Sequence, residues 1–304
     1  MKTYRSNGKL LLTGEYVVLD GALALALPTT FGQDLTVESN ESSKLIWTSI
    51  DHSGNVWFEA MFDIDMILSK APLKNPDAVS QRLIQILRAA LTQNPNFISL
   101  DEGLTVTTQL EFNKSWGLGT SSTLINNIAS WARIDAYQLL KDTFGGSGYD
   151  IACAQYNSPI LYQVNSAKPQ IEPITFRPNF TEQLYFVYLN QKQDSRKGIA
   201  NYKALKKADK KSIERVTSIT KDILNCEDLD TFQGLLRAHE QTISELIAQE
   251  PIKNQLFSDF SGAIKSLGAW GGDFILVTSA NDPTDYFETK GYKTIFRYSD
   301  LILA

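Results

Sequence analysis

Residues 117–123, GLGTSST, place two glycines and a run of hydroxyl side chains directly before an apolar segment. Glycine permits positive φ and lets the backbone approach a ligand closely. The first turn of a helix offers unpaired N–H groups and a partial positive charge, so an anion placed there gains several hydrogen bonds. The segment therefore predicts a phosphate-binding loop at the start of a helix. Capping of that helix by a single hydroxyl explains the loop taken alone equally well.

Three further glycine segments accompany this loop, GKLLLTGEY at 8–16, GGSGYDIA at 145–152 and GAWGGDF at 268–274. The loop does not match two common phosphate-binding patterns. It lacks G-x-x-x-x-G-K-[ST], and Ser122 occupies the place of the third glycine in G-x-G-x-x-G. The loop has to be interpreted together with the other segments.

Taken together, the segments resemble the motifs of the GHMP kinases, the superfamily of galactokinase, homoserine kinase, mevalonate kinase and phosphomevalonate kinase. Residues 7–16 match the pattern PGK…GEY, and residues 114–122 match P-x-x-x-G-L-G-S-S-A. Residues 147–150 match S-G-x-D, and residues 268–272 match G-A-G-G-G. They follow the family's order and span residues 7–273. Four motifs in order are far more specific than any one of them.

The resemblance implies an α+β, two-domain GHMP kinase fold. An N-terminal domain like ribosomal protein S5 domain 2, residues 1–170, would carry the phosphate loop. A ferredoxin-like C-terminal domain would cover residues 171–304, with the ATP site between the two. Prolines at 169, 173 and 178 mark the expected boundary.

The resemblance also implies a catalytic pair for phosphoryl transfer to a hydroxyl. Asp150 matches the family aspartate and would act as the general base. Lys9 of the first motif would keep Asp150 ionised and polarise the acceptor hydroxyl. Without the resemblance, Asp150 is better interpreted as a cap on the helix that begins IACAQY, and Lys9 as a solvated lysine at the start of a strand.

By the same match, the loop residues would bind the phosphates of ATP, and Ser121 would also lie near Mg²⁺. The expected phosphate ligands are Gly117, Leu118, Gly119, Thr120, Ser121 and Ser122. Gly271 and Gly272 would form a close structural turn near the phosphates.

The acceptor is expected to be a small molecule with a carboxylate or phosphate. Ser195, Arg196 and Lys197 follow a predicted strand, and this cationic segment suits an anionic ligand. Glu15 and Tyr16 either face the acceptor or are strand residues beside the turn. Both interpretations stay open.

Three departures from the family pattern stand out. The proline-rich approach to the phosphate loop is NKSW here, and Trp270 replaces a glycine, which predicts a narrower space beside the phosphates. In mevalonate kinases a Mg²⁺-binding Glu precedes the catalytic Asp by about eleven residues, as that resemblance implies. Here Leu139 holds that position beside Gln138, so either the ion has no such ligand or another acid such as Asp142 serves.

The predicted function is an ATP- and Mg²⁺-dependent kinase of isoprenoid biosynthesis, with phosphomevalonate as first choice of acceptor and mevalonate as second. GEY in place of GEH and a third motif ending in Gly-Gly-Asp favour this order. The alternatives are a kinase for another small alcohol or sugar, and a non-catalytic nucleotide-binding homologue.

The bulk composition fits this interpretation. The chain has 304 residues, 43% of them hydrophobic and 21% charged, so a packed core is expected. A net charge of −5 argues against nucleic acid as a partner, and no apolar run is long enough to cross a membrane. With only two cysteines and no signal-peptide pattern, we expect a cytoplasmic protein. We expect it to be a monomer or a homodimer.

The chemistry-bearing residues need a strand-rich N-terminal half and a helix-rich C-terminal half to position them. Apolar runs and alternation predict strands near 9–19, 22–28, 34–39, 44–50, 55–62, 103–112, 182–190, 268–279 and 292–300, with a turn between the first two at Asp20-Gly21. Helical periodicity predicts helices near 76–91, 121–134, 135–142, 198–224, 228–249 and 252–267.

Overall fold

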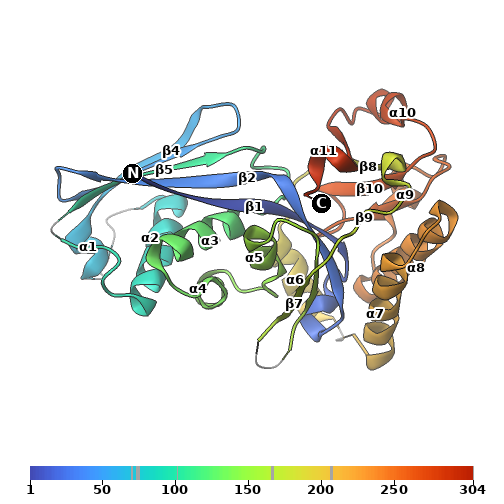
Figure 1. Ribbon diagram of the computed structural model, residues 1–304, viewed down its shortest axis with the longest axis horizontal. Helices are drawn as coiled ribbons and strands as arrows, with labels where there is room; N and C mark the ends of the chain where they lie inside the picture. The colour runs from blue at the N-terminus through green and yellow to red at the C-terminus, as the bar shows by residue number, and fades with distance from the viewer. Residues whose placement is uncertain (70, 73–75, 101, 166–167, 206–207, 304) are drawn as a thin grey trace. The chain divides into compact units, whose positions relative to one another are not determined.

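Figure 1 shows the computed structural model, which describes residues 1–69, 71–72, 76–100, 102–165, 168–205 and 208–303. Packing divides the chain into two compact units. Unit 1 comprises Met1–Gly8, Phe31–Lys114 and Gly119–Gln155, and unit 2 comprises Lys9–Thr30, Ser115–Leu118 and Tyr156–Ala304. The units interleave along the chain because strands β1 (Lys2–Thr13) and β2 (Ala24–Asn40) each contribute residues to both. The linear domain boundary near residue 170 stays a prediction.

Unit 1 contains a sheet in the order β4-β3-β5-β2, built from strands that the sequence predicted. The added strands are β3 (Lys44–Ile50), β4 (Val56–Asp63) and β5 (Gly103–Leu110). β5 runs antiparallel to β2 and parallel to β3. Alternate side chains such as Leu45 and Trp47 are buried, so one face of the sheet forms part of the core.

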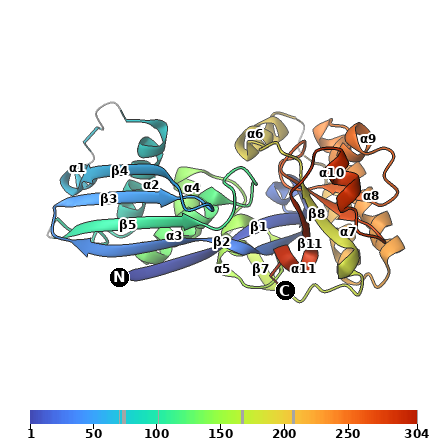
Figure 2. The same cartoon turned by 90° about the horizontal axis from the view of Figure 1, so that it is seen from above.

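Helices cover that face of the unit 1 sheet, as Figures 1 and 2 show from two directions. They are α1 (Ile64–Leu68), α2 (Ala78–Gln93), α3 (Thr120–Ala132), α4 (Ala136–Thr143) and α5 (Tyr149–Gln155). Asp77 and Asp135 cap α2 and α4 by accepting hydrogen bonds from first-turn amides. The predicted helices at 76–91, 121–134 and 135–142 are confirmed to within two residues at either end.

Leu139 on α4 is fully buried in the unit 1 core. The neighbouring Gln138 is exposed and donates a hydrogen bond to Asp142 at 2.7 Å. A carboxylate at position 139 would lie in an apolar environment without water. The packing therefore explains why an apolar residue occupies the position that the family resemblance assigns to a metal ligand.

Unit 2 contains two groups of strands. Residues 24–26 of β2 pair with β6 (Ile160–Gln163), which pairs with β7 (Gln170–Pro173). A separate antiparallel sheet has the order β11-β8-β10-β9. Its strands are β8 (Leu184–Tyr188), β9 (Ile264–Ser266), β10 (Phe274–Thr278) and β11 (Ile295–Arg297).

The remaining elements of unit 2 are helical. They are η1 (Val17–Asp20), η2 (Thr181–Gln183), α6 (Ser195–Ala204), α7 (Lys210–Leu224), α8 (Leu229–Ile247), α9 (Ile252–Leu256), α10 (Thr284–Thr289) and α11 (Tyr298–Leu301). α7 and α8 lie side by side (Figure 1). Asp194, Asp209 and Asp228 cap α6, α7 and α8, so the predicted helical tract at 198–224 consists of two separately capped helices.

The predicted helix at 252–267 is wrong. α9 ends at Leu256, and residues 264–266 form strand β9, paired with β10. Gly262 lies in the intervening turn, where a Cβ atom would come within 1.8 Å of the Thr278 carbonyl oxygen. This close approach of two backbones requires glycine at 262. Residues 264–266 pair with β10 instead of continuing the helix, although their apolar spacing is also compatible with a helix.

The chain contains a mixed sheet with helices on one face and a separate antiparallel sheet. This combination makes it an α+β protein, as predicted. Among the helices that the structure describes, none combines the length and apolar character needed to cross a bilayer.

Candidate active site

The glycine loop at 117–119 has the backbone conformation that its composition predicted. Gly117 has φ of 70° and Gly119 of 97°, values that favour glycine. α3 begins directly after Gly119, and no side chain caps its first turn. Its amide groups are therefore available to an anion, as a phosphate-binding helix start requires.

The hydroxyl run after the glycines divides into two groups. The Ser122 hydroxyl is buried and donates to the Gly119 carbonyl at 2.9 Å, and Thr123 donates to Gln33 Oε1 at 2.6 Å. The side chain of Ser121 is exposed, and its hydroxyl makes no hydrogen bond to another described residue. Local structure thus accounts for two of the four hydroxyls, whereas the half-buried Thr120 and the exposed Ser121 make no such bond within the described residues.

Asp150 lies in the first turn of α5, which packs against α3 within unit 1. Its side chain is half-buried, and Oδ1 accepts a hydrogen bond from the Ile151 amide at 3.2 Å. This bond is not an N-cap bond, which would come from the amide two or three residues further on, and α5 already begins at Tyr149. The capping interpretation therefore does not describe Asp150, and its role as base stays a prediction.

Lys9 contacts the first two residues of the phosphate loop, Gly117 and Leu118, within unit 2. Its Nζ donates to the Gly117 carbonyl at 2.8 Å, and its backbone amide donates to the Leu118 carbonyl at 2.9 Å. Lys9 is half-buried. It is therefore no freely solvated lysine, and its proposed partnership with Asp150 of unit 1 stays a prediction.

Asp273 packs directly against this loop. Its carboxylate atoms would lie 2.5–2.7 Å from a Cβ at Gly117, and Oδ1 accepts from the Gln193 amide at 3.0 Å. Burial raises the pKa of Asp273, while the bond from Gln193 and the charges of Lys9 and Lys192 oppose that rise. Its backbone φ of 52° is unusual for a residue other than glycine. The last residue of the third motif thus shapes the phosphate loop.

Gly271 and Gly272 form the expected close turn, but their contacts are with the segment before α6. A Cβ at Gly272 would come within 2.3 Å of the Gln191 carbonyl oxygen, and the Gly271 carbonyl accepts from Gln193 Nε2 at 2.9 Å. The indole of Trp270 is buried in a cluster with Tyr16 and other apolar residues. The expectation that it narrows the phosphate site stays a prediction.

Tyr16 and the Ser195–Lys197 segment come together in unit 2. The predicted cationic loop is the exposed first turn of α6. The Tyr16 ring stacks on Tyr202 of that helix with centroids 5.4 Å apart, and the Tyr202 hydroxyl donates to Asp20 at 2.5 Å. A Cβ at Gly198 would lie 2.7 Å from the Tyr16 hydroxyl. Tyr16 therefore adjoins the turn that carries Ser195, Arg196 and Lys197.

The Glu15 carboxylate is 1% exposed and accepts a hydrogen bond from Lys265 of β9. Contact with an acceptor would require it to leave this buried ion pair, so its predicted substrate role remains untested. The sequence interpretation missed Lys265 because it assigned residues 252–267 to a helix. The available signal was a lone lysine among apolar residues in GAIKSLG.

Two further ionisable groups lie beside this pair. Glu240 accepts hydrogen bonds from the amide and hydroxyl of Ser266, and His239 Nε2 accepts one from the Gly14 amide at 2.9 Å. Burial raises the pKa of both Glu15 and Glu240 to about 7, opposed by Lys265. Burial also lowers the pKa of His239 well below its usual value, so this imidazole is neutral.

No protein-family model and no curated protein sequence matches the chain, whereas solved structures do. The mevalonate kinase of Methanococcus jannaschii aligns over 100% of this chain and 98% of its own, with 13% identity and a TM-score of 0.73. The phosphomevalonate kinase of Streptococcus pneumoniae, in complex with phosphomevalonate and AMPPNP, aligns over 100% and 98%, with 15% identity and a TM-score of 0.68. The chain has the GHMP kinase fold.

The galactokinase of Lactococcus lactis, complexed with galactose, is similar as well, over 97% of this chain and 92% of its own, with 14% identity and a TM-score of 0.69. These kinases act on different acceptors. The resemblance seen in the motifs is thus confirmed for the GHMP kinase fold, and the low identities leave the acceptor to be inferred from this chain's own residues.

The residues of unit 1 fit the phosphates of ATP better than they fit a protein-held Mg²⁺ ion. The uncapped start of α3 and the free hydroxyl of Ser121 provide donors and one oxygen ligand. Within the described ranges, no three His, Cys, Asp or Glu residues gather closely enough to hold a metal. A Mg²⁺ ion would therefore depend on Ser121, water and the phosphates for most of its ligands.

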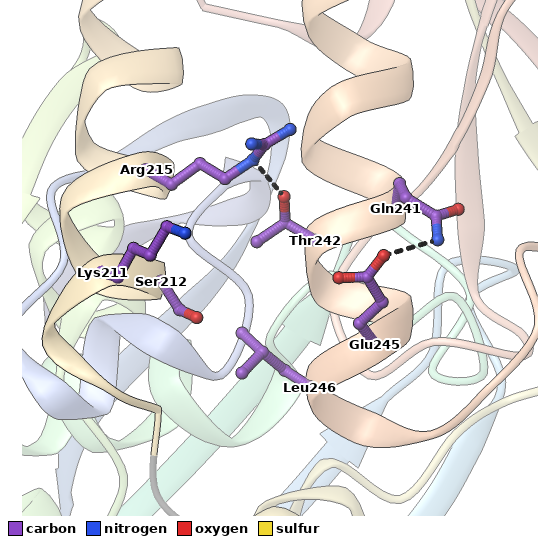
Figure 3. Close-up of a pocket in the computed structure, with 7 residues that line it drawn as sticks. All are labelled: Lys211, Ser212, Arg215, Gln241, Thr242, Glu245 and Leu246. Carbon is purple, nitrogen blue, oxygen red and sulfur yellow. Dashed lines mark hydrogen bonds between the residues drawn. The ribbon is translucent and has the colours of Figure 1, made fainter.

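A pocket of about 370 Å³ lies between α7 and α8, away from these residues in the sequence (Figure 3). Arg215 donates to Thr242 at 3.0 Å and Gln241 donates to Glu245 at 2.8 Å, so two of its polar pairs are already satisfied. None of the seven lining residues belongs to a glycine motif. The pocket has no role in the site described above.

We predict that Gly117→Ala lowers the free energy of unfolding by about 2–4 kcal/mol, measured by urea denaturation. The added methyl group combines a left-handed alanine with a clash against the Asp273 carboxylate. Gly145→Ala is the matched control, because φ there is 69° and no heavy atom lies within 4 Å of the new Cβ. It should cost only about 1 kcal/mol. An equally large cost of Gly117→Ala in an Asp273→Ala background would contradict the clash.

Glu240 generates a prediction about pH. Its pKa in the folded state, about 7, exceeds the ordinary value of 4.5, so the folded protein holds this proton more tightly than the unfolded chain. Its contribution to stability is complete below pH 4.5 and is lost as the pH rises through 7. Glu240→Gln should therefore gain stability relative to the wild type, by about 1–3 kcal/mol, between pH 5 and pH 8.

The measurement is urea denaturation at a series of pH values, and the change with pH is the readout rather than the absolute stability. Exposed Glu245→Gln on the same helix controls for the loss of one negative charge. Parallel wild-type and Glu240→Gln curves over this range would show that Glu240 does not titrate there.

Proposed function

We propose that the chain is an ATP-dependent small-molecule kinase. The observation that carries this proposal is the start of α3, where two left-handed glycines lead into an uncapped first turn with the exposed hydroxyl of Ser121. Such a turn binds phosphate through backbone amides. The GHMP kinase fold supports a nucleotide as the source of that phosphate.

In the proposed reaction, Asp150 takes the proton of the acceptor hydroxyl as its oxygen bonds to the γ-phosphorus of ATP. The bond between that phosphorus and the β–γ bridging oxygen breaks, and ADP leaves with the electron pair. Lys9 favours the ionised form of Asp150 and is oriented by its bond to the Gly117 carbonyl. Ser121 and the amides of α3 orient the phosphates and offset their charge.

The acceptor in this proposal is phosphomevalonate first and mevalonate second. Arg196 and Lys197 are exposed on the first turn of α6, and Tyr16, which occupies the GEY position, adjoins that turn at Gly198. Asp194 already caps α6 and pairs with Arg196, so the two exposed cations rather than the helix start support this choice. They suit an acceptor that already carries a phosphate, because each additional negative charge strengthens its binding.

A panel of acceptors tests this choice. We expect ADP release with Mg²⁺-ATP to be fastest with 5-phosphomevalonate, slower with mevalonate, and near background with galactose and homoserine. Arg196→Ala with Lys197→Ala should raise KM for the phosphorylated acceptor at least about tenfold and leave KM for ATP nearly unchanged. Fastest turnover with galactose or homoserine would overturn the choice of acceptor.

Asp150→Asn tests the base. Loss of a general base lowers turnover by about 10²–10⁴-fold. Because this substitution keeps the shape of the side chain and removes only its charge, the affinity for ATP, measured by calorimetry with AMPPNP, should stay within a few-fold of the wild type. Asp65→Asn is the matched control, an exposed acid in the first turn of α1 that is expected to keep activity. Wild-type turnover in Asp150→Asn would mean that the base is misassigned.

A non-catalytic nucleotide-binding homologue is the second candidate. It is favoured by Leu139, whose burial in the core removes an acidic metal ligand at that position. This candidate predicts ATP binding without ADP release for every acceptor in the panel.

A further inference from the structure

Unit 2 buries an ion pair that the proposed reaction does not use. Glu15 is 1% exposed and Lys265 is fully buried. The Lys265 ammonium donates to Glu15 Oε1 and to the Ser266 carbonyl oxygen at 2.9 Å. A buried charge without its partner is strongly destabilising, so neither residue can change its position independently of the other.

The pair joins the first motif to the third. Glu15 follows the end of β1, the strand that carries Lys9. Lys265 lies on β9, three residues before the glycine turn that begins at Gly268. The two residues are 250 positions apart in the sequence. Their bond therefore sets where the end of β1 lies relative to β9 inside unit 2.

The turn that contains Glu15 needs support from outside. Gly14 has φ of 91°, and Tyr16 has φ of 63°, a conformation that non-glycine residues adopt only where their surroundings enforce it. The polar contacts that hold the turn from outside include the ion pair at Glu15 and the hydrogen bond from the Gly14 amide to His239, and the ring of Tyr16 packs on Tyr202. Loss of the ion pair between Glu15 and Lys265 therefore removes one of the contacts that hold Tyr16 in its strained conformation.

Tyr16 transmits the geometry of the turn to α6. Its ring stacks on Tyr202, and its hydroxyl lies where a side chain on Gly198 would be. α6 carries the exposed Arg196 and Lys197. A shift of the turn at Glu15 therefore moves the support of the helix that presents these cations.

We propose that Glu15 and Lys265 are positioning residues, whose buried ion pair holds the turn at 14–16 so that Tyr16 and α6 keep the geometry that an anionic acceptor requires. This proposal rests on the proposed kinase function. Neither residue touches the reacting atoms in it. Both act through Tyr16.

The test uses Glu15→Gln, Lys265→Met and the double variant of the full chain. Each single variant leaves one buried polar group or charge without its partner and should lower Tm. The double variant removes both charges and should recover most of that loss. The double variant still lacks the ion pair that holds the turn at 14–16. Its KM for the phosphorylated acceptor should therefore stay at least about tenfold above wild type, while its KM for ATP stays nearly constant.

Hydrogen exchange of the α6 amides gives a readout that does not depend on turnover. We expect faster exchange over residues 195–204 in the double variant than in the wild type. Phe287→Leu, a substitution in the separate apolar cluster of unit 2, is the control for loss of stability alone and should leave α6 exchange and acceptor KM unchanged.

Recovery of Tm together with wild-type acceptor KM and wild-type α6 exchange in the double variant would overturn the proposal, because the pair would then serve stability only. Failure of the proposed function gives a different result. In that case no acceptor in the panel supports ADP release by the wild type, and the catalytic part of the proposal is removed. Hydrogen exchange of the α6 amides still shows whether the Glu15–Lys265 pair holds this helix in place.

Discussion

Burying an ammonium group away from water costs free energy that a neighbouring carboxylate offsets, and in unit 2 such a pair joins Lys265 to Glu15 across 250 residues of sequence. The bond fixes the end of β1 against β9. The other contacts of unit 2 follow from that arrangement. Tyr16 meets Tyr202 on one side of the turn, and the backbone of Gly14 meets His239 on the other.

A second constraint acts on the backbone around the phosphate loop. Gly117 and Gly119 adopt left-handed conformations, and Gly117 leaves room for the carboxylate of Asp273. Lys9 then binds the carbonyl groups of the loop through both its side chain and its backbone amide. Glycine here serves close packing as much as it serves a ligand. The loop is held in position before any phosphate binds.

The hydroxyl side chains that follow the loop differ in burial and in hydrogen bonding, and composition alone does not reveal this difference. Ser122 and Thr123 satisfy polar groups inside unit 1, and Ser121 points to solvent. Neighbouring residues on a helix point about 100° apart, so Ser122 and Thr123 face the interior while Ser121 of the four consecutive hydroxyls is exposed. No hydroxyl of the run caps the helix, and phosphate binding by it stays a prediction.

The sequence by itself determined the features that depend on neighbouring residues. Alternation predicted β3 and β5, periodicity predicted α2, and glycine spacing predicted the turns at 117–119 and 271–272. These follow from local backbone energetics. The same rules failed beyond Leu256, where residues 264–266 pair with β10 as strand β9.

Only the tertiary structure decided which side chains are buried and which partners they have. It placed Leu139 in the core, buried Trp270 in the cluster with Tyr16, and paired Lys265 with Glu15. Each outcome depends on contacts between segments far apart in the chain. Spacing within a segment carries no information about those contacts, because the partner of a buried charge is set by how the sheets and helices pack.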